Sequence, residues 1–325
     1  MIFFNKEDVI QLTPNWKGER FDDGRPRVSD DILNRIAANT ITELWRVLYT
    51  SGYKYQFDRS LKTTHPGRVL AGRAVTANFM PTRPDLHQYL LNYGHTVEDR
   101  RGNFNQWAID QLVKDDVMVY DMKAKIYEGC PLGGNLTNTV YSKTGRGGII
   151  YGGMRDLEQV EGMADGQFYY LGSDPTPFMD TMLLGINVPV KIGDAVCMPG
   201  DIVLGTTAGL LFIPPHLAED AVNDAEKSHI RDIWGFIRIA QGKYTAAHMD
   251  SPWGVEMWED FAGWFDTDKE AEPYRHLDFS RELDDVKKGI VRNFYGEIIS
   301  IKGAKPEKGV PQGAGADPNA YATRD

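Results

Sequence analysis

Residues 148–156 read Gly-Ile-Ile-Tyr-Gly-Gly-Met-Arg-Asp, and the prediction of the fold begins from these residues. Its first four residues form an apolar run that is typical of a buried strand in a parallel sheet. Gly152 and Gly153 follow, and we expect them to let the chain turn tightly as it leaves the strand. Arg155 and Asp156 then project at the carboxyl end of the strand, which is where open α/β sheets bind their ligands.

Helical and strand patterns alternate on both sides of this stretch. Helices are predicted at 105–114, 135–144 and 156–164, and apolar runs follow them at 117–120, 148–151 and 168–171. This alternation predicts βαβ units and a layered α/β core. The other predicted core elements are helices at 30–38, 40–51 and 216–241, and strands at 68–80, at 210–213 and, as a pair joined by a Pro-Gly turn, within 194–205.

Three segments lie outside this core, which we place at residues 29–241. Residues 1–28 mix charges, glycine and proline without a regular period, so we predict an arm on the surface of this or a neighbouring subunit. Residues 82–104 are polar and irregular and are predicted to form an insertion or lid. Residues 242–325 are predicted to be a C-terminal extension and tail, whose aromatic stretch at 253–265 packs onto the core or a neighbour.

The composition excludes several classes of partner. The chain has 325 residues, of which 42% are hydrophobic, a formal net charge of -10 and a pI of about 5.3. Nucleic acid and anionic membranes are excluded, because phosphate binding needs a basic patch. No apolar run approaches the roughly 20 residues that span a bilayer, and no signal-peptide pattern is present, so we predict a soluble cytoplasmic protein. Cys130 and Cys197 fit neither a disulfide framework nor a zinc site and are predicted to be core thiols.

A second pair of glycines adds to the predicted site. Residues 133–136 open the predicted helix with free N–H groups that can bind a carboxylate. Arg155 suits bidentate capture of a planar carboxylate, and Asp156 suits a hard cation such as Mg²⁺ or Mn²⁺. The alternative is that Asp156 only caps its helix, with Gln159 at the third position, and that Arg155 is a surface arginine. The candidate substrate-binding residues are Gly133, Gly134, Asn135, Leu136 and Arg155.

Five motifs, in a fixed order along the chain, carry a resemblance to a known family. They are GRVLAGRAVT at 67–76, Gly134 followed after twenty residues by Arg155-Asp156, VPV at 188–190, PGDIV at 199–203 and GLLFIP at 209–214. Over roughly residues 30–235 the chain resembles the RraA-like family. That family includes 4-hydroxy-4-methyl-2-oxoglutarate aldolases with oxaloacetate decarboxylase activity, and regulators of ribonuclease E.

The resemblance implies a fold, an assembly and a reaction. The fold is an α/β/α swivelling-domain fold, and the assembly is a homotrimer or homohexamer with active sites at subunit contacts. The reaction is the divalent-metal-dependent cleavage of a carbon–carbon bond in a small 2-oxo acid. Aldol cleavage of a 4-hydroxy-2-oxo acid and decarboxylation of oxaloacetate both pass through a metal-stabilised enolate, so one site can support both reactions.

The resemblance also implies roles for individual residues. Arg155 would bind the 2-oxo acid and stabilise the enolate, and it is the catalytic residue of this interpretation. Asp156 would hold Mg²⁺ or Mn²⁺, partly through water. The backbone amides of residues 133–136 would contact the substrate.

The chain departs from the family pattern within this site. Aldolase members carry an aspartate, thought to take part in proton transfer, where this chain has Gly134, so the acid–base group stays open. Gly134 is shared with the regulator branch, whose acidic residue three positions after the aspartate is here Gln159. Glu158 and Glu161 are candidates for the outer shell of the metal.

Two histidines lie in the predicted lid at 82–104. His87 and His95 are candidates for the missing acid or base, because imidazole titrates near neutral pH. The alternative is that they belong to a solvated polar loop.

Two other functions stay open. The chain can be a non-catalytic protein-binding regulator, as in the ribonuclease E branch. It can also use the family scaffold for altered chemistry on a sugar-derived acid, and residues 82–104 are where such a change of substrate would be encoded.

Overall fold

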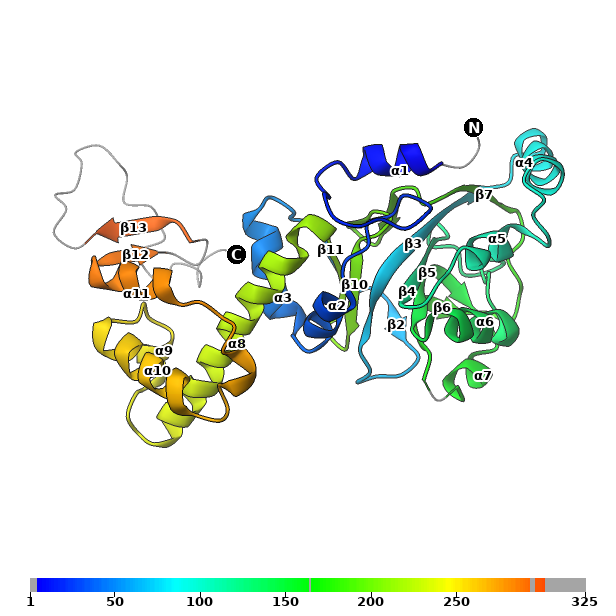
Figure 1. Ribbon diagram of the computed structural model, residues 1–325. Helices are drawn as coiled ribbons and strands as arrows, with labels where there is room; N and C mark the ends of the chain where they lie inside the picture. Colours follow the sequence, from blue (N-terminus) through cyan, green and yellow to red (C-terminus); the bar gives the residue numbers. More distant parts are fainter. Residues whose placement is uncertain (1–4, 164, 293–295, 302–325) are drawn as a thin grey trace, which may run out of the picture. The chain divides into compact units, whose positions relative to one another are not determined.

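The computed structural model describes residues 5–163, 165–292 and 296–301. The chain divides into two compact units, Met1–Val222 and Asn223–Asp325, and Figure 1 shows the elements of each. The division falls within helix α8 (Ala218–Ala240), whereas the sequence predicts that the core domain continues to residue 241. The difference arises because Ile230 and Trp234 of α8 pack into the aromatic cluster of the second unit.

The first unit is built on a mixed sheet that is nine-stranded over the described residues. The strand order is β1-β11-β10-β3-β4-β5-β6-β2, and β7 pairs with the second half of β3. Strands β3 to β6 run parallel, and the other pairs are antiparallel. The strands are β1 (Phe57–Asp58), β2 (Lys62–Thr63), β3 (Leu70–Pro81), β4 (Asp116–Asp121), β5 (Gly147–Met154), β6 (Gln167–Ser173), β7 (Thr181–Ile186), β10 (Ile202–Thr206) and β11 (Gly209–Ile213).

Helices such as α5 and α6 cover one face of this sheet (Figure 1). A hairpin packs against part of the other face. Phe104 and Trp107 of α5 and Val140 of α6 belong to a core cluster with Tyr120 and Ile150 of the sheet. The opposite cluster includes residues of β8 (Val190–Ile192) and β9 (Ala195–Cys197), which pair with each other. The helices of this unit are α1 (Lys6–Leu12), α2 (Asp30–Ala37), α3 (Ile41–Thr50), α4 (Pro84–Thr96), α5 (Phe104–Asp110), α6 (Gly134–Thr144), α7 (Leu157–Glu161) and the 3-10 turn η1 (Pro215–Leu217).

The mixed α/β fold that the sequence predicts is confirmed. Every residue of β4 is buried, which is why these central parallel strands appear in the sequence as continuous apolar runs. The helix predicted at 40–51 is α3, and a capping box of Thr40 and Glu43 opens it. The predicted Pro-Gly turn joins β9 to β10, with Gly200 at a φ of +83° and the Asp201 N–H donating to the Met198 carbonyl.

The prediction that residues 82–104 are irregular is wrong, because most of this segment is helical. Helix α4 begins with Pro84 at its first position, where proline needs no hydrogen-bond partner. Leu90 and Gly94 are buried, and a Cβ on Gly94 would overlap the Trp107 ring. A glycine inside a helix signals a loop in the sequence, but here it lets α4 pack closely onto α5.

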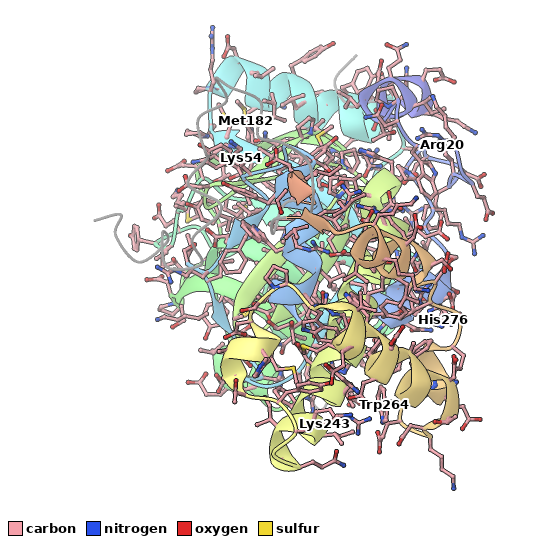
Figure 2. The ribbon with its side chains drawn as sticks, turned by 90° about the vertical axis from the view of Figure 1, so that its left-hand side faces the viewer. Arg20, Lys54, Met182, Lys243, Trp264 and His276 are labelled. Atoms are coloured by element: carbon pink, nitrogen blue, oxygen red, sulfur yellow. The ribbon has the colours of Figure 1, made fainter. Side chains whose placement is uncertain are left out.

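The predicted surface arm also needs correction. Its first part forms helix α1, opened by a capping box between Asn5 and Asp8. Arg20, labelled in Figure 2, donates to the Thr13 hydroxyl and to the Gly24 carbonyl and so organises the arm internally. Arg25 is 1% exposed and its two terminal nitrogens bond the two carboxylate oxygens of Asp116, at 2.9 and 3.1 Å. The arm therefore reaches the core of its own unit.

The second unit is held together by aromatic side chains. Trp234, Trp253, Trp258 and Phe261 are buried in one cluster with Trp264, which Figure 2 labels. Its elements are α8 from residue 223, α9 (Ala246–Met249), α10 (Val255–Thr267), the 3-10 turn η2 (Glu272–Tyr274), α11 (Ser280–Lys287), β12 (Ile290–Arg292) and β13 (Ile298–Ile301). The predicted tail, residues 302–325, lies outside the described residues. In the part of the chain that the structure describes, no helix has the length and apolarity to cross a membrane.

The Arg25–Asp116 pair should be essential to stability. Replacing Arg25 with alanine leaves a fully buried carboxylate without its cation, which should cost about 3–5 kcal/mol of unfolding free energy. The matched control is Arg27→Ala, because the Arg27–Glu19 pair is exposed and should contribute under about 1 kcal/mol. Denaturant unfolding measures both, and equal losses for the two variants would contradict this account.

Candidate functional site

A pocket of about 720 Å³ opens at the carboxyl ends of the parallel strands. It is lined by residues that follow β4, β5 and β6 and by the start of α5. This is the expected location of a ligand site in an α/β sheet. The structure brings six residues of the predicted site together around it, namely Gly133, Gly134, Asn135, Leu136, Arg155 and Asp156.

Asp156 is held by the start of helix α6. Its backbone is left-handed, with φ 56° and ψ 39°, and its side chain makes no cap bond to α7. Instead, its Oδ2 accepts a hydrogen bond of 3.0 Å from the Gly134 N–H. The alternative in which the Asp156 side chain merely caps its helix is therefore wrong. A carboxylate at a helix N-terminus is stabilised by the helix dipole and by the free N–H groups there.

Gly133 leaves room for the two charged side chains. A Cβ at Gly133 would overlap Asp156 Oδ2 and would come within 2.8 Å of Arg155 Nε. Arg155 Nε lies 3.7 Å from Asp156 Oδ2, so the pair forms a loose ion pair at the pocket wall. Both side chains are about one-third exposed, at 35% and 37%, and can therefore meet a ligand.

Gly152 and Gly153 serve a different purpose from the one predicted. The prediction that they form a tight turn is wrong, because both lie within strand β5. A Cβ on Gly153 would come within 2.5 Å of Cys130 Sγ and 2.6 Å of the Ile126 carbonyl oxygen. The glycines thus allow the loop before α6 to cross the end of β5 in close contact. The change of direction comes instead at Asp156, whose left-handed backbone aspartate and asparagine tolerate better than most residues.

Gln159 occupies the space beside Gly134. A Cβ on Gly134 would overlap the Gln159 side-chain oxygen, so a side chain at 134 and the present position of Gln159 exclude each other. A carboxamide has no titratable proton near neutral pH, and Gln159 therefore cannot replace an aspartate in proton transfer.

The first turn of α6 offers further donors. Asn135 and Leu136 line the pocket, and their N–H groups have no acceptor within the helix because they belong to its first turn. Together with the Arg155 guanidinium they supply hydrogen-bond donors that an anion can use.

Cys130 also lines the pocket. Burial raises the pKa of its thiol to about 11, and its Sγ contacts the carbonyl oxygens of Ile126 and Asp174. The thiol therefore stays protonated at neutral pH and is a poor nucleophile. Both Cys130 and Cys197 are free and buried, so the prediction of core thiols is confirmed.

Of the described residues that line the pocket, Asp156 alone carries a carboxylate that a cation could use. Among the described residues, no group of three or more His, Cys, Asp or Glu side chains could hold a metal ion. Asp156 Oδ1 has no hydrogen-bond partner there and can supply one hard oxygen. Glu158 and Glu161 are exposed and do not line the pocket.

The two histidines of α4 lie elsewhere. The His87 ring packs against Phe104 with centroids 5.2 Å apart. The His95 ring packs against Trp107, and its Nε2 lies 2.9 Å from the Gly102 carbonyl oxygen. Neither histidine lines the pocket.

Sequence reasoning missed the side of the pocket that α5 provides. Asn103, Asn105 and Gln106 line it. Asn103 and Gln106 form a capping box at the start of α5. That spacing of a capping residue and a glutamine three positions later is the signal that could have located the start of this helix.

Comparisons with known proteins relate the chain to one family. The sequence model described as RraA-like (Aldolase/RraA) matches residues 26–212. A relative from Thermus thermophilus, named "Putative 4-hydroxy-4-methyl-2-oxoglutarate aldolase", is 29% identical over 83 residues. These residues are 26% of this chain and 50% of that protein, so the chain spans about half the length of that relative.

Solved structures share the fold. RraAS2 of Streptomyces coelicolor, described as an unusual member of the RNase ES inhibitor RraA protein family, aligns with a TM-score of 0.56 at 20% identity. The alignment covers 66% of this chain and 99% of that one. An uncharacterized protein from Pseudomonas syringae aligns with a TM-score of 0.55 at 20% identity, covering 69% of this chain and 94% of that one.

The Gly133→Ala variant tests the geometry of the pocket wall. The added methyl group should displace Arg155 and Asp156 without unfolding the chain, because the backbone φ of −119° suits alanine. Oxalate, a compact planar anion, should bind about ten-fold more weakly by calorimetry. Gly263→Ala is the control, since a Cβ there meets nothing within 4 Å. Unchanged oxalate binding by Gly133→Ala would exclude this wall as the anion site.

Proposed function

The chain belongs to the RraA-like family, and from this premise we propose that it is a divalent-metal-dependent carbon–carbon lyase for small 2-oxo acids. The reaction is aldol cleavage of a 4-hydroxy-2-oxo acid, decarboxylation of oxaloacetate, or both. The observation that carries the proposal is the convergence of Arg155, Asp156 and the start of α6 on one pocket. These groups together can bind a carboxylate and a hard cation.

Arg155 and the start of α6 would bind the substrate carboxylate. The planar guanidinium can form two parallel hydrogen bonds to a carboxylate, which fixes the plane of the 2-oxo acid. The N–H groups of Asn135 and Leu136 provide donors on the adjoining wall. Arg155 would also stabilise the negative charge that develops on the 2-oxo oxygen as the carbon–carbon bond breaks.

Asp156 would hold the metal. Its Oδ2 is fixed by the Gly134 N–H, so Oδ1 is the oxygen that can face a cation. When bound, Mg²⁺ or Mn²⁺ supplies Lewis acidity to the 2-oxo group. The other ligands would come from the substrate and water, because the described residues provide no cluster of further protein ligands.

Water would accept and donate the protons of the reaction in this pocket. Gln159 cannot titrate, and burial keeps the Cys130 thiol protonated. In aldol cleavage the proton of the 4-hydroxyl group would therefore leave to water. The enolate would take a proton from water at its third carbon.

A second function is favoured by one observation. Gly134 stands where aldolase members are expected to have an aspartate, and it is shared with the branch of protein-binding regulators, which it therefore favours. A non-catalytic regulator of ribonuclease would retain the fold and lack turnover. A panel of 2-oxo acids with no turnover would support that function over the lyase.

The catalytic prediction separates Arg155 from Asp156. With Mg²⁺ or Mn²⁺ the protein should release pyruvate from oxaloacetate or a 4-hydroxy-2-oxo acid, and EDTA should stop the release. Arg155→Lys loses the planar fork and should lower kcat/KM by about 30- to 1000-fold, or about 2–4 kcal/mol, without rescue by metal. Asp156→Asn tolerates the left-handed backbone and still accepts from Gly134, so excess metal should partly restore its activity.

The control for these variants is Arg83→Lys, since Arg83 is exposed and pairs with Asp85 outside the pocket. It should retain the activity of the unmodified chain. Turnover that persists in EDTA would exclude the metal-dependent mechanism. Near-normal activity in both Arg155→Lys and Asp156→Asn would show that the active site lies elsewhere in the protein.

We also propose that the chain assembles as a homotrimer or homohexamer, as the family resemblance implies. The pocket, lined in part by Pro177 and Phe178 just before β7, would then be completed by a neighbouring subunit, and closed symmetry is the common outcome for such contacts. Light scattering at micromolar concentration should report three or six subunits. A monomer would contradict an assembly in which a neighbouring subunit completes the pocket. The proposed roles of Arg155 and Asp156 would still be tested by the kinetic measurements.

A further inference from the structure

Five carboxamide side chains line the pocket together with the charged pair Arg155 and Asp156. We name them the carboxamide collar, and they are Asn103, Asn105, Gln106, Asn135 and Gln159. Of the described residues that line the pocket, Arg155 is the one cation and Asp156 the one carboxylate. Beyond Arg155, the polar groups that face a ligand are therefore mostly neutral amides.

Hydrogen bonds hold the collar at the start of α5. Asn105 is 8% exposed, and its Nδ2 donates to the Pro131 carbonyl at 2.7 Å, which leaves its Oδ1 as an acceptor facing the pocket. Asn103 Oδ1 accepts from the Phe104 N–H, and Gln106 Oε1 accepts from the Asn103 N–H. Their amide nitrogens remain as donors.

The other two members of the collar are free to bond a ligand. Asn135 and Gln159 have no side-chain hydrogen bond within the described residues, so each presents both a donor and an acceptor to the pocket. The collar as a whole thus offers both hydrogen-bond donors and acceptors to a ligand. A hydroxyl group, which donates one hydrogen bond and accepts two, is the ligand group that uses such a set most fully.

A second carboxylate would be poorly matched to this wall. Arg155 serves the first carboxylate, and a distal one would be desolvated against amides that cannot neutralise its charge. An apolar chain would be equally unsuitable, because it would cover the Asn105 oxygen and leave it without a hydrogen bond. The volume of about 720 Å³ is also larger than a three-carbon acid requires.

We propose that the site takes a polyhydroxylated monocarboxylate, a sugar-derived acid whose carboxylate binds Arg155 and whose hydroxyl groups bind the carboxamide collar. For binding, the proposal stands on the pocket alone. For the reaction, it rests on the proposed lyase function and names the substrate as a 4-hydroxy-2-oxo acid with further hydroxyl groups beyond its fourth carbon.

The reaction on such a substrate is balanced without an added reactant. The bond between the third and fourth carbons breaks, and its electron pair forms the enolate. The 4-hydroxyl group gives its proton to water and becomes the carbonyl of a hydroxylated aldehyde. The enolate then takes a proton from water at the third carbon and becomes pyruvate.

Three non-reacting six-carbon probes test the binding directly by calorimetry on the full chain. Gluconate carries the hydroxyl groups and one carboxylate, glucarate adds a distal carboxylate, and hexanoate lacks the hydroxyl groups. Gluconate should bind about ten-fold more tightly than each of the others. Glucarate or hexanoate binding as tightly as gluconate would overturn the proposal.

Variants of the collar test whether it causes the preference for gluconate. Asn105→Leu removes the buried acceptor and should weaken gluconate binding about ten-fold while changing oxalate binding less than about two-fold. Gln159→Leu is the second variant, because Gln159 makes no structural hydrogen bond in the described residues and its loss should leave the fold intact. Gln88→Leu is the matched control, since Gln88 is a carboxamide of α4 outside the pocket. Equal gluconate binding by all three variants and the unmodified chain would refute the role of the collar.

Failure of this proposal and failure of the lyase function give different results. Selective gluconate binding without turnover of any 2-oxo acid would support the sugar-acid site and reject the lyase. Turnover of oxaloacetate without selective gluconate binding would support the lyase and reject the sugar-acid site.

Discussion

The hydrogen bond from the Gly134 N–H to the Asp156 carboxylate, 3.0 Å long, is the contact on which the rest of the site depends. It joins the start of α6 to the turn after β5, so two segments that are separate in sequence form one wall. The contact requires Gly133 to lack a side chain, Asp156 to adopt a left-handed backbone, and Gly153 to admit the loop that precedes α6. Arg155 reaches the pocket because all three conditions are met.

The two ends of strand β4 serve different purposes, because one end carries a buried ion pair and the other leads to the pocket. Asp116 at its first position is buried and paired with Arg25 of the arm. The last residue of β4, Asp121, leads into the loop that carries Cys130 and Gly133 to the pocket. The desolvated ion pair can therefore fix the sheet without placing a second fixed cation near the ligand. Arg155 is therefore the one cation among the described residues that line the pocket. Under our proposal, the carboxamide collar around it then determines which substrates bind.

Local patterns predicted the central fold, and long-range contacts account for what was missed. The apolar runs of β4, β5 and β6 were visible because strands buried on both faces need apolar residues in succession. Strand β8 is three residues long and carries no comparable pattern, and α4 contains a glycine whose purpose depends on Trp107, which lies in another helix. Likewise, the burial of Arg25 follows from Asp116, 91 residues away. The motif residues of the site were predicted from the residue pattern together with the family resemblance, whereas Asn105 joins the pocket through tertiary contact with Pro131.

The central claim is that Arg155 and Asp156 act together, one on a 2-oxo acid and the other on a divalent cation. The most direct measurement is a crystal structure of the protein soaked with Mn²⁺ and oxalate, with an anomalous difference map to locate the metal. We expect an anomalous peak beside the Asp156 carboxylate and an oxalate that contacts both this ion and the Arg155 guanidinium. Manganese bound away from Asp156, or oxalate bound away from Arg155, would contradict it.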